Sequence, residues 1–160
     1  MQLYILRHGI AEDAGPGRSD EERALTGEGK DKLRRVLDRA RRAGTTPTLI
    51  LTSPYVRAVQ TARLAAQHLG CRHEPVETDA LVPSGSPLRV WEEIRAHHAE
   101  EQLLLSGHEP LLSQLVSYLL DSPALAVDMK KGAMVRIQLE RFGPEPHGIL
   151  VWMLTPKLAG

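Results

Sequence analysis

Short apolar segments alternate along the chain with longer amphipathic segments, and this alternation predicts the order of strands and helices. Three short apolar segments are expected to form buried strands, at residues 2–6, 48–52 and 102–106. Two further strands, at residues 133–139 and 148–154, are expected near the end of the chain. Strands that alternate with helices are typical of a mostly parallel sheet with helices on both faces. The pattern therefore predicts an α/β fold.

Residue types that begin and end helices stand between these strands. Thr26 is expected to cap a helix that runs to about residue 43. Ser53–Pro54 predicts a cap followed by proline at the first helical position, and Gly70 should end that helix. Ser86–Pro87 repeats the signal before a third helix. The same pattern also predicts a loop over residues 10–25, a weaker strand over residues 72–78 and a helix over residues 111–120.

Composition limits the classes of function that fit. The 160 residues suit one domain, residues 1–160, and the 20 basic and 20 acidic side chains balance to zero net charge. This balance argues against nucleic acid or an anionic membrane as partner. Cys71 is the only cysteine, so neither an internal disulfide nor a cysteine zinc site can form. No signal peptide or membrane-length apolar segment is evident, so we expect a cytoplasmic monomer.

Basic residues follow three of the predicted strands. Arg7 and His8 come at the end of the first strand, Arg57 soon after the second, and His108 after the third. In parallel α/β sheets, ligands bind beyond the carboxyl ends of the strands. We therefore expect these two arginines and two histidines to meet at one edge of the sheet.

This set of side chains suits phosphoryl transfer without a metal or another cofactor. Arginine forks can bind the equatorial phosphoryl oxygens and cannot lose their charge. A neutral histidine can attack phosphorus, and a second histidine can donate to an oxygen as charge develops. Gly9 would leave room for backbone beside the attacking ring.

Four ordered motifs carry a resemblance to a known family. Arg7-His8-Gly9, residues 53–62 (SPYVRAVQTA) and Gly107-His108-Glu109-Pro110 resemble the three motifs of the histidine phosphatase (phosphoglycerate mutase-like) superfamily. Residues 23–29 (RALTGEG) resemble its Leu-Thr-x-x-Gly element, with an arginine just before it. The resemblance implies a phosphoglycerate mutase-like three-layer α/β/α sandwich.

The resemblance also implies roles for individual residues. His8 would be the phosphorylated nucleophile, and Arg7, Arg57 and His108 would form the phosphate pocket. Arg23 would either contact phosphate or substrate, or be a solvated loop charge.

The short length and residues 81–85 (LVPSG) are most similar to SixA-type phosphohistidine phosphatases. That similarity implies a phosphorylated histidine on a phosphorelay or phosphotransfer protein as substrate. The short segment between the second helix and the third main strand leaves no room for a large lid, which also favours a protein substrate.

No general acid is evident between the second and third motifs. Asp79 is the nearest carboxylate, and Glu109 is better explained as a residue that favours the start of a helix. An imidazole leaves without the proton that an alkoxide needs, so a missing acid fits phosphohistidine. Two alternatives are a phosphatase for small phosphate monoesters, with an acid that the sequence does not identify and for which Asp79 is one candidate, and a noncatalytic module that binds phosphorylated proteins.

Overall fold

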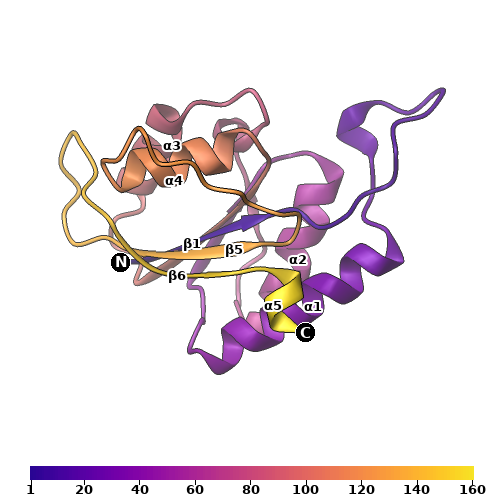
Figure 1. The fold of residues 1–160 in the computed structure, drawn as a ribbon, viewed down its shortest axis with the longest axis horizontal. Helices are drawn as coiled ribbons and strands as arrows, with labels where there is room; N and C mark the ends of the chain where they lie inside the picture. Colours follow the sequence, from indigo (N-terminus) through magenta and orange to yellow (C-terminus); the bar gives the residue numbers. More distant parts are fainter.

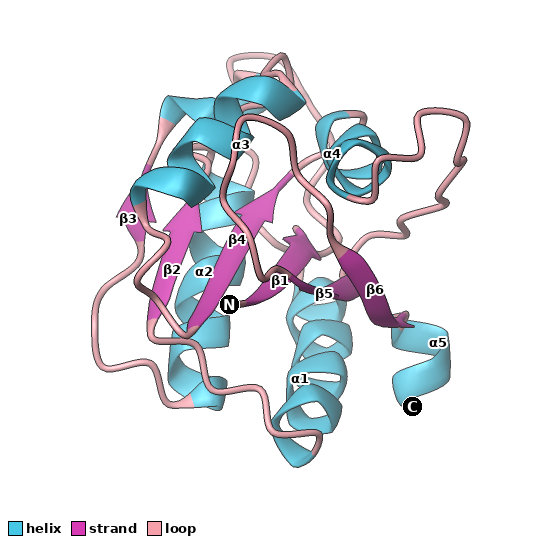
Figure 2. Ribbon diagram, turned by 90° about the vertical axis from the view of Figure 1, so that its left-hand side faces the viewer, coloured by secondary structure: helices cyan, strands magenta, loops and turns pink.

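The computed structural model describes residues 1–160 and contains one mixed sheet of six strands. Figure 2 shows the strands side by side in the order β3-β2-β4-β1-β5-β6. The first four in this order run parallel, while β5 and β6 are antiparallel to their neighbours. The bounds are β1 (Gln2–Arg7), β2 (Leu49–Thr52), β3 (Val76–Glu77), β4 (Gln102–Gly107), β5 (Met134–Gln138) and β6 (Ile149–Leu154).

Helices cover both faces of this sheet, as the alternating pattern predicts. In Figure 1, α3 (Pro87–Ala96) and α4 (Leu111–Leu119) lie above the sheet. The helices α1 (Gly27–Arg42), α2 (Val56–Leu69) and α5 (Pro156–Ala159) pack on the opposite face, and α1 and α5 lie below the sheet in Figure 1. The three-layer α/β/α prediction is therefore confirmed. Two short 3₁₀ helices, η1 (Asp20–Glu22) and η2 (Asp79–Leu81), complete the list of elements.

The pleat of β1 explains why the hydrophobic core is divided between the two faces. Leu3 and Ile5 belong to the cluster packed with α3 and α4, whereas Tyr4 and Leu6 belong to the cluster packed with α1 and α2. Successive side chains of a strand point to opposite faces, so a strand buried on both sides must be continuously apolar. Full burial of each such side chain contributes about 1.5–3 kcal/mol to folding.

Most of the predicted helix ends are confirmed. The Thr26 hydroxyl accepts a hydrogen bond from the Gly29 N–H at 3.0 Å, and Ser86 caps α3 in the same way. Gly70 ends α2 with φ of 75°, a left-handed conformation that glycine adopts without a steric cost. These local signals are reliable here because each one supplies a hydrogen bond or a backbone angle that the helix end requires.

Two of the predicted boundaries are wrong. The helix expected to begin at Ser53–Pro54 begins instead at Val56 after Tyr55, because the Ser53 hydroxyl contacts His108 and accepts the Tyr55 N–H. The strand expected over residues 72–78 is reduced to Val76–Glu77 at the sheet edge. Pro75, just before it, has no N–H with which to extend the pairing.

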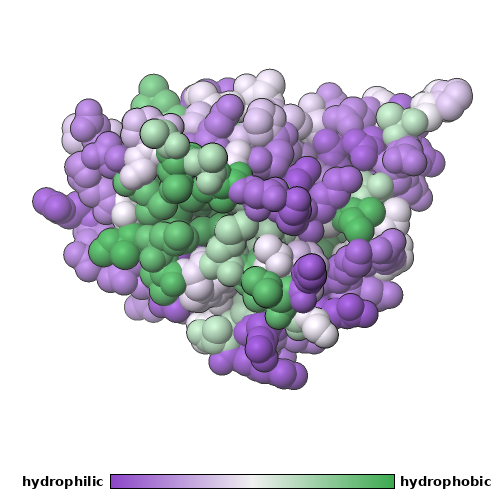
Figure 3. Space-filling view, in the orientation of Figure 1, coloured by the Kyte–Doolittle hydropathy of each residue, from purple (hydrophilic) through white to green (hydrophobic).

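The outer surface is uneven in polarity. Figure 3 shows the face seen in Figure 1, where the largest group of hydrophobic side chains lies left of centre and smaller groups lie among hydrophilic ones elsewhere. Ile149, Leu150 and Val151 on the edge strand β6 are among the exposed apolar residues. None of the helices combines the length and apolar character needed to cross a membrane.

Candidate active site

The sheet register brings the three motif segments to one edge. Arg7 pairs with Gly107 across the parallel strands β1 and β4, and Thr52 of β2 pairs with Ser106. The next residue of each strand continues this alignment, since the His8 N–H donates to the Gly107 carbonyl at 3.0 Å. The structure therefore brings His8, Ser53 and His108 together at the carboxyl ends of neighbouring strands.

The ring of His8 is held in one orientation by a bond at each nitrogen. Nδ1 lies 2.7 Å from the Gly9 carbonyl oxygen, which can only accept, so Nδ1 carries the proton. Nε2 then has the free lone pair and accepts from Arg57 Nε at 3.3 Å. Burial lowers the pKa of His8 to about 4, aided by the charges of Arg57, Arg7 and Lys131 and opposed by the Gly9 carbonyl. The ring is neutral at pH 7, with Nε2 available as a nucleophile.

His108 lies against His8 with 5.1 Å between the ring centroids. Its Nε2 is 2.8 Å from the hydroxyl of Ser53, and the ring of Tyr55 packs edge-on at 5.0 Å. Burial, followed by the neighbouring His8, lowers the pKa of His108 to about 3. Nδ1 of His108 is buried without a hydrogen-bond partner in the protein.

Two arginines border the histidine pair. Arg7 Nη1 donates to the Met129 carbonyl at 2.7 Å, and its Nε is buried without a partner. Burial lowers the pKa of Arg7, while Glu109 and Asp128 act in the opposite direction. Arg57 is almost fully buried, and its guanidinium donates to Nε2 of His8 and to two oxygens of Asp20. The site therefore holds two cations beside two neutral rings.

Asp20 was not anticipated from the sequence, yet its carboxylate joins two arginines. Its Oδ2 lies 3.2 Å from Arg57 Nη2, and its Oδ1 lies 2.8 Å from Arg23 Nη1. The Asp20 carbonyl also accepts from Arg57 Nη1 at 2.7 Å. The hydrogen bond from Arg23 is the largest cause that lowers the pKa of Asp20, and Arg57 adds to it. Arg23 is therefore linked to Arg57 only through Asp20. The loop over residues 10–25, which carries both Asp20 and Arg23, projects from the body of the molecule in Figure 1.

Gly9 is required by close packing with α1. A Cβ at this position would lie 2.6 Å from Cδ1 of Leu33. The Gly9 N–H donates to the Thr61 hydroxyl at 3.2 Å, and that hydroxyl donates to the Arg57 carbonyl at 2.7 Å. Thr61, which the sequence reasoning did not identify as a site residue, therefore links the backbone of the first motif to that of the second.

The two candidate carboxylates of the sequence lie outside the hydrogen-bonded cluster. Asp79 begins η2 in an exposed position, and its carboxylate has no hydrogen bond or ion pair with the cluster. Glu109 accepts from the Ser113 N–H at 2.8 Å in the first turn of α4, which confirms its expected helix-start role. The structure therefore gives no support to Asp79 as a proton donor.

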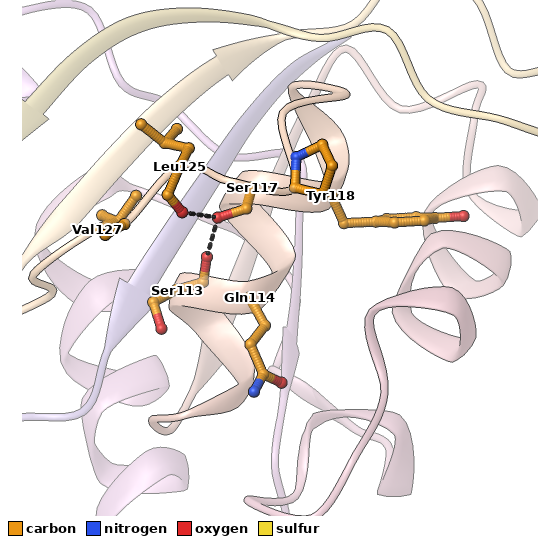
Figure 4. A pocket seen from close by; sticks show the side chains of 8 residues that line it. Ser113, Gln114, Ser117, Tyr118, Leu125 and Val127 are labelled. Atoms are coloured by element: carbon orange, nitrogen blue, oxygen red, sulfur yellow. Dashed lines mark hydrogen bonds between the residues drawn. The ribbon is translucent and has the colours of Figure 1, made fainter.

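A separate cavity of about 420 Å³ lies between α4 and the chain that follows it. Figure 4 shows Ser117 in this cavity, with its hydroxyl 2.7 Å from the Leu125 carbonyl and 3.1 Å from that of Ser113. None of the clustered arginines or histidines lines it. In the whole structure, no group of three or more His, Cys, Asp or Glu side chains is arranged to hold a metal ion.

The fold and the arginine–histidine cluster define a phosphate-handling enzyme class, and the family comparison agrees. The chain belongs to the histidine phosphatase superfamily, because the model of its branch 1 matches residues 3–82.

Comparison with individual proteins indicates which members of the superfamily this chain resembles. Phosphohistidine phosphatase SixA of Escherichia coli is 27% identical over 160 residues, covering 98% of this chain and 94% of that protein. The structure of SixA complexed with tungstate superposes with a TM-score of 0.86 at 26% identity, covering 98% of both chains. An uncharacterized protein of Picosynechococcus sp. PCC 7002 is 38% identical over 117 residues, which are 71% of this chain and 70% of that one. The chain is thus SixA-like by sequence and by structure.

Proposed function

We propose that this protein is a phosphohistidine phosphatase that takes phosphate from a histidine of another protein onto Nε2 of its own His8. The observation that carries the proposal is the state of the His8 ring. It is neutral near pH 7, its Nδ1 is committed to the Gly9 carbonyl, and its Nε2 lone pair faces the Arg57 guanidinium. A nucleophile of this kind needs no base to remove a proton before it attacks.

In the first step, the Nε2 lone pair of His8 forms a bond to phosphorus as the phosphorus–nitrogen bond of the substrate breaks. The electron pair of that bond stays with the departing imidazole, whose other nitrogen carries a proton, so the ring leaves neutral. Arg57 Nε must release Nε2 as the bond forms, and the guanidinium is then free to donate to a phosphoryl oxygen. In the second step, water attacks the phosphorus, the bond to His8 breaks, and the water proton leaves with inorganic phosphate.

The charge that develops on the phosphoryl oxygens would be stabilised by the groups around His8. Arg7 and Arg57 supply permanent positive charge, and the unpartnered Nε of Arg7 is a buried donor that a phosphoryl oxygen can satisfy. If the Ser53 hydroxyl donates to Nε2 of His108, the proton of that ring is on Nδ1, its other buried unpartnered nitrogen. That N–H could then donate to a second oxygen. Arg23 would act indirectly, because it pairs with Asp20, whose carboxylate would compete with a phosphoryl oxygen for the Arg57 guanidinium.

The surroundings of the site favour phosphohistidine over a phosphate ester. An alkoxide leaving group needs a proton donor, whereas an imidazole is a far weaker base. The carboxylate in contact with the cluster, Asp20, has a lowered pKa and is therefore ionised, so it cannot donate a proton at neutral pH. The similarity to SixA, which is named as a phosphohistidine phosphatase, supports the same substrate class.

Turnover of a phosphohistidine peptide and of p-nitrophenyl phosphate, both in the presence of a chelator, tests the proposal. Wild type and His73→Ala, which alters an exposed loop histidine, should both favour the peptide. The variant His8→Ala should lose at least about a thousandfold in kcat, as removal of a nucleophile does in other enzymes. Labelled phosphate should be trapped on His8 in the wild type.

Three results would overturn the proposal in different ways. Preference for the ester would retain the phosphatase and replace its substrate class with small phosphate monoesters. Activity that survives in His8→Ala, or that requires an added metal, would refute the histidine-nucleophile mechanism itself. Binding of the peptide without any covalent label would indicate a noncatalytic module.

A further inference from the structure

A second concentration of positive charge borders the active site. It surrounds a pocket of about 690 Å³ whose walls come from β1, α1, the chain before β5, and α5. Figure 1 shows α5 beside α1, below the end of β6. The charged residues that line this pocket are Arg7, Lys32, Lys130, Lys131, Lys157 and Asp128.

This lysine pocket is joined to the site that contains His8. Arg7 belongs to both, and the charge of Lys131 contributes to the lowered pKa of His8. The chain before β5 is fixed there by its backbone, since the Gly132 N–H donates to the His8 carbonyl at 3.0 Å. The Met129 carbonyl accepts from Arg7 Nη1 at 2.7 Å in the same segment. A group bound in the lysine pocket therefore lies next to the phosphoryl group that His8 would attack.

The positive charge of the pocket is only partly neutralised. Lys130 pairs with Asp128 at 2.8 Å, and Lys32 pairs with Glu28 at 2.7 Å. Lys131 and Lys157 have no ion pair with any acidic group of the protein. In a chain with zero net charge, this local excess lies beside the proposed nucleophile and can attract an anionic group there.

We propose that the lysine pocket binds the carboxylates of acidic residues that flank the phosphohistidine of a protein substrate, an inference that rests on the proposed function. The lysines carry point charges on long, flexible stems, and the ammonium-bearing side chain of Lys130 is 66% exposed. A site for one defined second phosphate would instead be expected to offer forked arginine donors, and Arg7 is the only arginine here. Mobile charges at the rim of a site suit a patch of acidic side chains whose positions vary.

Synthetic peptides test this assignment directly. Each peptide carries one phosphohistidine, and the flanking positions hold glutamate in one peptide, glutamine in the second and lysine in the third. For wild type, kcat/KM should be about tenfold higher for the glutamate peptide than for the glutamine peptide, and lowest for the lysine peptide. The preference should shrink as salt is raised from about 50 mM to about 500 mM, because exposed charges are screened.

Matched double variants locate the origin of the preference. Lys131→Gln/Lys157→Gln should reduce the glutamate-to-glutamine ratio to about twofold or less. Arg42→Gln/Arg72→Gln removes two exposed arginines that have no ion pairs. Arg42 ends α1 and Arg72 follows α2, and neither lines the lysine pocket, so this variant should keep the tenfold ratio. Because the readout is a ratio within one protein sample, partial unfolding of a variant lowers both rates and leaves the ratio unchanged.

The outcomes distinguish this inference from the function on which it rests. Equal kcat/KM for the three peptides, with turnover still dependent on His8, would overturn the lysine pocket and keep the phosphatase. A preference that persists in Lys131→Gln/Lys157→Gln would place the recognition elsewhere and would also overturn it. Failure to hydrolyse any of the peptides would refute the proposed function and this inference together.

Discussion

Acidification from about pH 7 to about pH 5 should leave the His8 ring neutral, although a histidine in water would be almost fully protonated. With the pKa lowered to about 4, about nine-tenths of the rings stay neutral at pH 5. With the ordinary pKa of about 6.5, only about 3% would be neutral. The two cases differ by about thirtyfold in the population of the nucleophilic form. Burial is the largest cause of the lowered pKa, so the measured pKa of His8 indicates how well the site excludes water.

A titration followed by nuclear magnetic resonance measures this pKa without any substrate. The imidazole C–H signal that disappears in His8→Gln identifies His8, and its shift should remain unchanged down to about pH 5. Free imidazole added to the same sample serves as the reference. A midpoint near 6.5 for His8 would refute the reasoning, because it would mean that neither burial nor the arginines control the ring.

The same shift makes the stability of the protein depend on pH. The pKa values of His8 and His108 are lower in the folded protein than in the unfolded chain, so the unfolded chain binds more protons below about pH 6.5. The free energy of unfolding should therefore fall from pH 7 to pH 5, by about 2 kcal/mol for each histidine. Urea denaturation at both pH values measures this loss, and His8→Gln should lose about half as much as wild type. A pH-independent midpoint would contradict the assignment.

Three further predictions concern neighbouring residues. Ser53→Ala leaves Nε2 of the buried His108 without its partner and should lower the free energy of unfolding by about 1–3 kcal/mol in urea denaturation, with slower turnover. Gly29→Ala should lower the melting temperature, at a cost of about 1–3 kcal/mol or more, because its Cβ would clash with the backbone carbonyl oxygen of Ile10. Gly27→Ala, which meets nothing within 4 Å, is its matched control in calorimetry and should not lower it. Asp20→Asn removes an exposed anion beside the site and should lower the inhibition constant of inorganic phosphate by about twofold to fivefold. An unchanged or raised constant would contradict the competition between this carboxylate and phosphate.

The alternation of apolar segments was enough to predict the layers of the fold and the strands that precede the motifs. Periodicity records which side chains are buried, and the continuously apolar β1 is buried on both faces. The motif residues His8 and His108 could be predicted to meet because parallel strands align their carboxyl ends. Local signals at helix ends were similarly informative, except at Ser53, where a tertiary contact to His108 replaced the expected cap.

Only the tertiary structure decided the chemistry around those motifs. Asp20 contacts Arg57 across a loop that has no periodicity, so no local pattern could have identified it. The lysine pocket joins Lys32, Lys131 and Lys157 from three distant segments, a placement that follows from how α1 and α5 pack. The lowered pKa of His8 depends on removal of water from its ring. Sequence patterns indicate which side chains of one helix or strand face the core. The charge state, degree of burial and hydrogen-bond partners of a site residue depend on other residues that packing brings next to it.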